Sequence, residues 1–228
     1  MAGPGLFALR DFARLATPSV SLPPSTLLLE TPKCIAVFDA YPKARYHFLV
    51  LPKLPFPGDT GLLEGNLDSL AALLRHPARG AVVDAMAAAA DEVVEMVRDE
   101  MHKTEGFEWG VNVGFHSVPS MRHLHLHVIS DDLTSPSLKN KKHYNSFRPD
   151  LGFFVPLGDV QQWITDAGDG GDLDARATAL HANETLLTTP LSCFKCDEGM
   201  SNMPALKRHL DEEWQNAKAK ATSTSLTR

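Results

Sequence analysis

One stretch constrains the fold more than any other: residues 123–129 read His-Leu-His-Leu-His-Val-Ile. Side chains on a β-strand point alternately to opposite faces, so this pattern predicts a strand with all three imidazoles on one face. The other face, formed by Leu124, Leu126 and Val128, is expected to pack on a core. The segment therefore predicts a sheet with a buried side and a polar side.

The three histidines have three interpretations. A zinc site using all three is disfavoured, because a strand separates His123 from His127 by roughly 13 Å, too far for ligands of one tetrahedral ion. Structurally satisfied core histidines would need three buried hydrogen-bond partners. The favoured interpretation is nucleophilic catalysis, because a neutral imidazole with a pKa near ~6.5 attacks phosphorus without a deprotonating base. The phosphoramidate that forms is then cleaved by water.

A bend precedes this strand. Residues 114–121 combine small residues with His116, Ser117 and Ser120. Their backbone N–H groups and hydroxyls are expected to converge on phosphate oxygens. His116 is the candidate for protonating a leaving oxygen. The bend and the strand together predict a site for attack on phosphorus.

Periodicity elsewhere predicts the frame around this site. Helical spacing of apolar residues predicts helices over residues 62–74 and 81–101, the latter with a solvated acidic face. Short apolar runs bounded by turn residues predict strands over residues 26–29, 34–38, 46–51, 108–115, 123–129 and 153–155. This order predicts an α+β fold, in which an antiparallel sheet packs against helices.

Composition narrows the class. The chain has 228 residues, 43% hydrophobic and 22% charged, which suits one soluble globular domain with a small appendage. We find no run of the roughly 18 apolar residues that span a bilayer and no signal-peptide pattern, so no membrane partner is expected. Three cysteines cannot all pair, which favours a reducing compartment.

Charge is unevenly distributed. The formal net charge is −6, but acidic residues concentrate in residues 59–105 and 159–190, whereas residues 133–149 contain none. Basic residues interleaved with aromatic ones suit a phosphate backbone and an unstacked base, although a solvated loop is the alternative. The basic and aromatic residues of this segment are Lys139, Lys141, Lys142, Tyr144, Phe147 and Arg148.

The N-terminal segment, residues 1–24, predicts a short amphipathic helix followed by a linker. Apolar residues recur at helical spacing between Leu6 and Leu15, with arginines on another face. Phe7 and Phe12 are candidates for packing against an end base pair of a duplex. An arginine-bearing helix is also compatible with part of an organelle transit peptide, which keeps a mitochondrial location open.

The C-terminal region follows zinc-finger spacing. The candidate ligands of one structural Zn²⁺ are Cys193, Cys196, His209 and Glu213, with glutamate where a second histidine is usual. His209 and Glu213 are four positions apart and so share one helix face. A redox CxxC is the alternative, but no thioredoxin-type strand precedes it. The basic residues of this finger, candidates for DNA contact although fingers also bind proteins, are Lys195, Lys207 and Arg208.

These motifs resemble the histidine triad (HIT) superfamily of nucleotidyl hydrolases and transferases. The resemblance rests on HLHLHVI and on three longer stretches: DAYPKARYHFLVLPK, GFHSVPSMRHLHLHVIS and SPSLKNKKHYNSF. It covers roughly residues 25 to 215. With the finger, it indicates a short DNA-processing form with a HIT domain and no forkhead-associated domain.

The resemblance implies a role for each matching residue. His125, the middle histidine, is the nucleophile, and His123, His127 and His47 surround it as phosphate and tautomer partners. His116 and the bend contact phosphate. The substrate-binding residues are Asp39, which holds the ribose hydroxyls, Lys43, Ser117, Ser120 and Met121. Lys142 and His143 face DNA. Tyr144 departs from the expected tryptophan.

The function implied is hydrolytic removal of AMP from 5′-adenylated DNA at nicks and strand breaks, through an adenylyl-histidine intermediate. No catalytic metal is expected, AMP is the product, and the resemblance implies a nucleus-localised protein that we expect to be monomeric. Protein partners cannot be read from the sequence. Two alternatives stay open: a HIT hydrolase of dinucleoside polyphosphates or AMP-amidates, and a zinc-finger DNA-binding protein with an idle HIT domain.

The expected division of the chain follows. After the N-terminal segment, a HIT domain spans residues 25–165, and residues 166–190 form a linker or exposed loop. The finger spans residues 191–217, and residues 218–228 form a tail.

Overall fold

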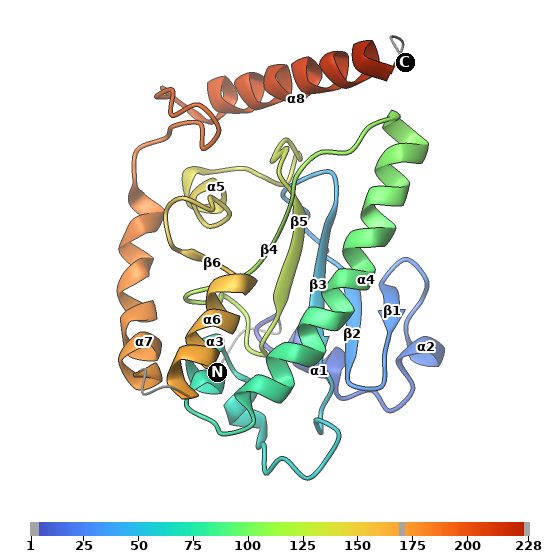
Figure 1. The fold of residues 1–228 in the computed structure, drawn as a ribbon, viewed down its shortest axis with the longest axis vertical. Helices are drawn as coiled ribbons and strands as arrows, with labels where there is room; N and C mark the ends of the chain where they lie inside the picture. The colour runs from blue at the N-terminus through green and yellow to red at the C-terminus, as the bar shows by residue number, and fades with distance from the viewer. Residues whose placement is uncertain (1–4, 169–171, 226–228) are drawn as a thin grey trace.

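A computed structural model describes residues 5–168 and 172–225 of the chain, and side chains as far as residue 223. Its centre is one antiparallel sheet of six strands in the order β1-β2-β3-β5-β4-β6 (Figure 1). The strands are β1 (Leu27–Glu30), β2 (Cys34–Phe38), β3 (His47–Pro52), β4 (Val111–His116), β5 (Leu126–Ser130) and β6 (Phe154–Pro156). The predicted α+β architecture is confirmed.

Helices connect and cover the strands. The α-helices are α1 (Ala8–Ala13), α2 (Pro18–Ser21), α3 (Leu70–Leu74), α4 (Arg79–Glu105), α5 (Lys141–Asn145), α6 (Leu157–Gly168), α7 (Leu173–Ala179) and α8 (Met203–Ser225). Two 3₁₀ helices are η1 (Glu64–Leu67) and η2 (Leu180–Thr188). Among the described residues, no helix combines the length and apolar character needed to cross a membrane.

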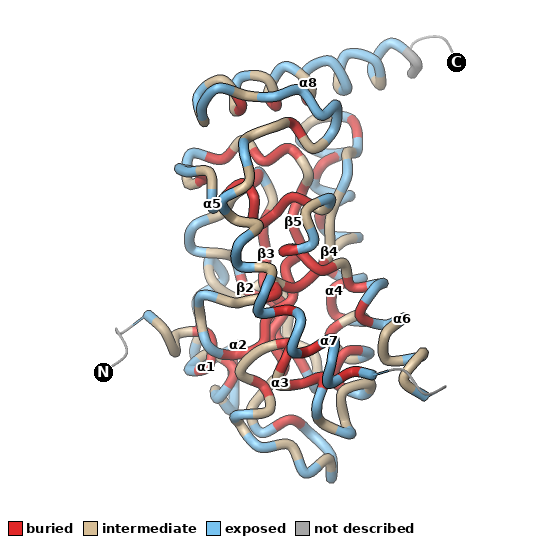
Figure 2. The backbone as a smooth tube through the Cα atoms, turned by 90° about the vertical axis from the view of Figure 1, so that its left-hand side faces the viewer, coloured by how far each residue is buried: buried red, intermediate tan, exposed pale blue. Residues whose placement is uncertain are grey.

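The longest element against the sheet is α4, which crosses one face (Figure 1). Its predicted apolar stripe, which includes Val82, Met86 and Val93, is buried against the strands. The helix ends at Gly106, whose φ of 74° is left-handed, a conformation that glycine adopts without the steric cost of a side chain. Burial is concentrated in the sheet, and α8 is largely exposed along one side (Figure 2).

The sheet is buried on both faces because its strands alternate. In β2, Ala36 packs on the α4 side, whereas Ile35 and Val37 join the opposite core. Leu9 of α1 completes that opposite core. The N-terminal helix is therefore built into the fold rather than attached to it.

Arg10 of α1 strengthens this attachment. Arg10 is only 6% exposed and bonds to Glu64, at 2.7 Å, and to Asp68. The Leu54 backbone N–H also donates to the Ala13 carbonyl at 2.7 Å. α1 is thus fixed close to β3 and to the segment before α3.

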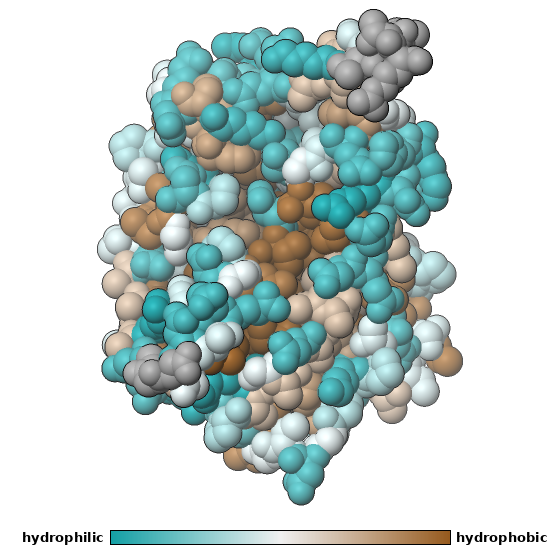
Figure 3. All heavy atoms as spheres, viewed as in Figure 1, coloured by the Kyte–Doolittle hydropathy of each residue, from teal (hydrophilic) through white to brown (hydrophobic). Residues whose placement is uncertain are grey.

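The C-terminal region shares a third apolar cluster with the far end of the sheet. Leu206 and Leu210 of α8 pack with Ile129, Tyr144 and Phe154. Figure 1 shows α8 lying across this end of the molecule. The finger and the sheet are therefore one packed unit. Seen from the direction of Figure 1, the surface of the molecule is mostly hydrophilic, with an apolar band across its centre (Figure 3).

Several predicted boundaries were wrong. Only the last part of residues 62–74 is α-helical, because η1 and a turn precede α3. Residues 166–190, predicted as a linker or exposed loop, contain α7 and η2, with Ala177 and Leu180 buried in the main core. Most of the predicted tail continues α8 to Ser225. Residues 1–4, 169–171 and 226–228 of the predicted segments lie outside the described residues.

The histidine strand also begins later than predicted. β5 starts at Leu126, and His123 has a φ of 104°, which is not an extended conformation. Leu124, Leu126 and Val128 face the main core as expected. The alternation of three imidazoles on one regular strand therefore does not extend back to His123.

Candidate active site and zinc finger

A pocket of about 200 Å³ opens on the α1 side of the sheet. It collects side chains from α1, the β2–β3 segment, the bend before β5, and α5. They include five predicted site residues of the β2–β3 segment and the bend, and two histidines of the triad. The lining residues are Leu9, Asp39, Tyr41, Lys43, Leu49, His116, Ser120, Met121, His125, His127, His143, Ser146 and Phe147.

Hydrogen bonds determine the tautomers of two histidines. The Lys43 backbone N–H can only donate, so Nδ1 of His47 accepts from it, at 3.2 Å. The proton of His47 then lies on Nε2, which donates to Nδ1 of His127 at 3.0 Å. His127 consequently carries its proton on Nε2. That nitrogen is buried without a hydrogen-bond partner among the described residues, so it is available to donate to a ligand.

His125 is oriented differently. Its Nδ1 lies 2.8 Å from the carbonyl oxygen of His123, which can only accept, so the proton is on Nδ1. The lone pair is then on Nε2. The residue is only 7% exposed, and it lines the pocket. A neutral imidazole with an unprotonated Nε2 is the form that acts as a nucleophile.

Burial keeps the cluster neutral. It lowers the pKa of His47 to about 4 and lowers the pKa of His125 from its ordinary value. The pKa values of His116 and His127 are held well below the usual range by burial, reinforced by the neighbouring histidines. Charged imidazoles would repel one another here, so the neutral forms are favoured.

Asp39 supplies negative charge at the mouth. Its Oδ1 accepts the Tyr41 backbone N–H at 2.7 Å, and its Oδ2 lies 3.7 Å from Nδ1 of His47, too far for a hydrogen bond. Lys43 lies beside it with its ammonium bonded to the Tyr41 carbonyl, and burial lowers the pKa of Lys43. A carboxylate and an ammonium group thus lie side by side in the lining of the pocket.

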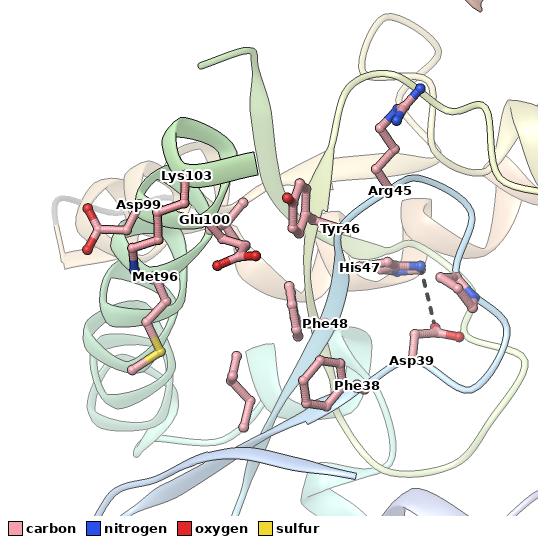
Figure 4. Close-up of a pocket in the computed structure, with 13 residues that line it drawn as sticks. Phe38, Asp39, Arg45, Tyr46, His47, Phe48, Met96, Asp99, Glu100 and Lys103 are labelled. Carbon is pink, nitrogen blue, oxygen red and sulfur yellow. Dashed lines mark ion pairs between the residues drawn. The ribbon is translucent and has the colours of Figure 1, made fainter. Parts of the chain in front are cut away.

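A larger cavity of about 630 Å³ lies between α4 and strands β1–β3, with Phe38, Phe48 and Met96 in its lining (Figure 4). Figure 4 shows His47 and Asp39 pointing away from α4. His47 and Asp39 nevertheless belong to the lining of this cavity, whereas His125 and His127 line the smaller pocket, which is therefore the site that the candidate nucleophile serves.

Three of the predicted catalytic and substrate-binding residues lie apart from the lining of the pocket: His47, which is bonded to the lining residue His127, His123 and Ser117. His123 is fully buried, with Nε2 bonded to the Pro52 carbonyl at 2.7 Å, and burial lowers its pKa to about 4. Ser117 is also buried, and its hydroxyl is shared between the Phe153 carbonyl and the Asn183 amide. His123 and Ser117 hold the backbone around the pocket.

Other predicted residues do line it. Ser120, Met121 and His143 join His116 at its wall. Phe147, which the sequence offers only as an aromatic of the basic segment, packs edge-on against His47 and His127, each with centroids 5.1 Å apart. No sequence signal marks Leu9 or Leu49 as lining residues.

The predicted DNA-contacting residues fall into two groups. Lys142 and Arg208 are exposed. Lys195 instead pairs with Asp131 at 3.0 Å, and Lys207 donates to the Ser135 carbonyl at 2.9 Å, so both tie the finger to the HIT domain.

The two aromatic residues of the N-terminal segment that were predicted to contact DNA also make contacts within the protein. Phe12 packs on the core of Leu9, and Phe7 lies beneath the Arg10 guanidinium, 5.1 Å from ring centroid to carbon. Both side chains keep part of their surface exposed.

The finger residues converge as zinc ligands do. Each of Cys193, Cys196, His209 and Glu213 offers one atom within 4.8 Å of the others. Cys196 Sγ lies 3.3 Å from His209 Nε2, which lies 3.1 Å from Glu213 Oε1. Such separations suit four ligands around a tetrahedral ion. The Lys195 backbone N–H, 3.4 Å from Cys193 Sγ, would support a thiolate.

The fold and these two sites define a histidine triad protein with a zinc-binding finger. Two family models match the chain: residues 21–143 match "Scavenger mRNA decapping enzyme C-term binding", and residues 150–216 match "C2HE / C2H2 / C2HC zinc-binding finger". The first model covers more than half of the chain, which therefore belongs to that family.

Several of the curated relatives are aprataxins. The chain is 34% identical to aprataxin of Ciona intestinalis over 188 residues, and 37% identical to that of Danio rerio over 176 residues. These alignments cover 82% and 77% of the chain but only 42% and 46% of the relatives. The chain thus spans less than half the length of these two aprataxin homologues.

A solved structure shares the fold. It is described as the crystal structure of aprataxin ortholog Hnt3 in complex with DNA, and it matches with a TM-score of 0.67 at 23% identity. The match covers 94% of the chain and 97% of that structure.

Proposed function

We propose that this chain is a hydrolase that removes AMP from 5′-adenylated DNA ends. The observation that carries the proposal is the tautomer of His125, which presents an unprotonated Nε2 in a pocket beside Asp39 and Lys43. The aprataxin homologues and the DNA complex of Hnt3 support DNA as the class of substrate.

The first step is attack on the adenylate. His125 Nε2 forms a bond to the AMP phosphorus, and the P–O bond to the DNA 5′-phosphate breaks, its electron pair leaving with the DNA. His127, with its proton on Nε2, donates a hydrogen bond to the phosphate oxygens on which negative charge builds up. AMP stays on His125 as a phosphoramidate.

Water completes the reaction. It adds to phosphorus while the P–N bond breaks, which releases AMP and restores the lone pair of His125. Asp39 is proposed to bind the ribose hydroxyls, since a carboxylate accepts two hydrogen bonds. His116 is held neutral by its lowered pKa, so a role as proton donor requires a nearby phosphate that raises this pKa.

The remaining surfaces are proposed to hold the duplex. Lys142 and Arg208 are exposed, Arg208 with Glu212 3.9 Å away, and are proposed to contact phosphates. Phe7, just before α1, and Phe12 of α1 are close in sequence to Leu9, which lines the pocket. The finger is proposed to bind a structural Zn²⁺. The protein is proposed to act in the nucleus as a monomer.

Turnover of two substrates tests the proposal. Adenylated nicked DNA and a free AMP-amidate are supplied at equal concentration, and release of AMP is followed. Preference for the DNA supports end processing, whereas equal or greater turnover of the amidate favours a small-nucleotide hydrolase. Duplex binding without turnover of either substrate would indicate an idle HIT domain.

A further inference from the structure

The segment between β2 and β3 also carries Arg45, which does not line the pocket. Asp39 and Lys43 line the pocket, whereas Figure 4 shows Arg45 extending away from Asp39 and from His47, the first residue of β3. The guanidinium carbon of Arg45 lies 3.9 Å from the ring centroid of Trp214 in α8. A segment that holds catalytic groups is therefore in direct contact with the zinc finger.

The contacts around Arg45 form a closed ring. Trp214 is 3% exposed and packs edge-on against Trp109, with centroids 5.3 Å apart. Trp109 Nε1–H donates to Asp132 at 3.2 Å, and the same carboxylate accepts the backbone N–H of Arg45 at 3.1 Å. Arg45 is thus held by its backbone on one side and by its side chain on the other.

The anchor of this ring is rigid. Asp132 is 1% exposed and also accepts from Ser130 Oγ, at 2.6 Å, and from Thr134 Oγ1, at 2.8 Å. A buried carboxylate with this many donors has little freedom to move. The carboxylates of Glu105 and Asp211 complete the surroundings of the guanidinium, 3.6 and 3.8 Å away.

In the sequence, Arg45 lies midway between Lys43 and His47, the two partners of a hydrogen bond that matters for catalysis. The Lys43 N–H, which donates to His47 Nδ1, fixes the protons of His47 and His127. Trp214 follows the zinc ligand Glu213 directly, so a bound ion would orient its ring.

We infer that Arg45 is a positioning residue: by stacking on Trp214 it holds the Lys43–His47 hydrogen bond in place, so that docking of the finger sets the tautomers of His47 and His127, next to the nucleophile His125. The effect on turnover rests on the proposed function, but the effect on the hydrogen bond does not.

The test compares two cations on the same tryptophan. Arg45→Met removes the cation of the β2–β3 segment, and Arg45→Lys is the conservative rescue. Lys218→Met is the matched control: Lys218 Nζ lies 5.5 Å from the Trp214 centroid and 2.6 Å from Glu105, but Lys218 is a residue of α8 and not of the β2–β3 segment. All variants are purified with zinc, and zinc content is measured.

Three measurements are made: amide exchange at Lys43, the ¹⁵N imidazole shifts of His47 and His127, and steady-state turnover of adenylated nicked DNA. In Arg45→Met, we expect Lys43 exchange to rise about ten-fold and His47 to become a mixture of tautomers. We expect kcat to fall about ten-fold with KM and zinc content unchanged. Arg45→Lys should recover most of this loss, and Lys218→Met should match the wild type.

Two results overturn the inference: unchanged exchange and tautomers in Arg45→Met, or the same changes in Lys218→Met. A rise in KM alone would make Arg45 a DNA contact and would also overturn it. Absence of turnover in the wild type contradicts the proposed function instead, because the exchange and ¹⁵N readouts need no substrate.

Discussion

Two clusters of this molecule gather potential metal-ligand atoms, yet they are organised differently. Asp39, His47 and His127 meet within 4.8 Å, as do the four finger residues. In the pocket, the closest approaches are hydrogen bonds between a backbone N–H and neutral imidazoles. In the finger, two thiols face an imidazole and a carboxylate, a set that zinc binds. Closely spaced imidazole nitrogens can therefore belong to a hydrogen-bond network or to a metal centre. The groups around them, an N–H donor in the first case and thiols and a carboxylate in the second, distinguish the two.

The largest loss of activity is expected from removing the nucleophile of the pocket. His125→Ala removes the group that bonds to phosphorus, so turnover of adenylated DNA should fall by on the order of 10⁴-fold or more. Affinity for nicked DNA, measured by fluorescence anisotropy, should stay close to that of the wild type. Residual turnover within ten-fold of the wild type would contradict the assignment.

Removing a finger ligand should have the next largest effect. Cys193→Ser should lose the one zinc ion bound per chain and, with it, several kcal/mol of stability, because metal binding and folding of such fingers are coupled. Zinc content by mass spectrometry and thermal unfolding provide the readouts. Cys34→Ala is the control, since Cys34 is buried in the sheet and far from the cluster in sequence. Full zinc content in Cys193→Ser would refute the site.

The pocket should make the protein acid-sensitive. The pKa of His47 is lowered to about 4 from an ordinary 6.5, so between these pH values the unfolded chain binds more protons than the folded one. Stability is therefore lost as the pH falls from 6.5 toward 4, by about 3 kcal/mol for His47 alone. Urea unfolding across this range measures the loss. His47→Gln should show a smaller slope, and an equal slope would contradict the lowered pKa.

A smaller effect should come from the junction between the two clusters. Tyr144 is fully buried, and its hydroxyl donates to the Ser192 carbonyl and accepts the Phe194 N–H, at 2.9 and 3.1 Å. Tyr144→Phe leaves these groups unpaired and should cost about 1–3 kcal/mol in the free energy of unfolding. Tyr46→Phe, which loses only an exposed bond to Thr104, is the control and should cost less.

The smallest effect concerns DNA affinity. Lys142→Ala should weaken binding a few-fold and reduce the slope of log affinity against log salt by about 1, because one phosphate contact is lost. Lys33→Ala, an exposed lysine in the β1–β2 turn, should leave the slope unchanged. Identical slopes for the two variants would remove Lys142 from the proposed interface.

The sequence could predict features that depend on periodicity and ligand spacing. Alternation placed Leu124, Leu126 and Val128 in the core, and finger spacing identified four residues that do converge. It could not predict the turn at His123, because alternation assumes an extended backbone throughout. The partner of Ser117 is Asn183, 66 residues away, and the partners of Lys195 and Lys207 lie in the HIT domain. Such contacts depend on tertiary packing that a local pattern does not encode.

Trapping the covalent intermediate tests the central claim most directly. Nicked DNA carrying a 5′-adenylate labelled in its AMP phosphate is mixed with the protein and quenched within one turnover at neutral or alkaline pH. We predict label bound to the protein at His125, lost on mild acid treatment and absent from His125→Ala. Release of labelled AMP by the wild type with no protein-bound label, or continued release by His125→Ala, would contradict the account.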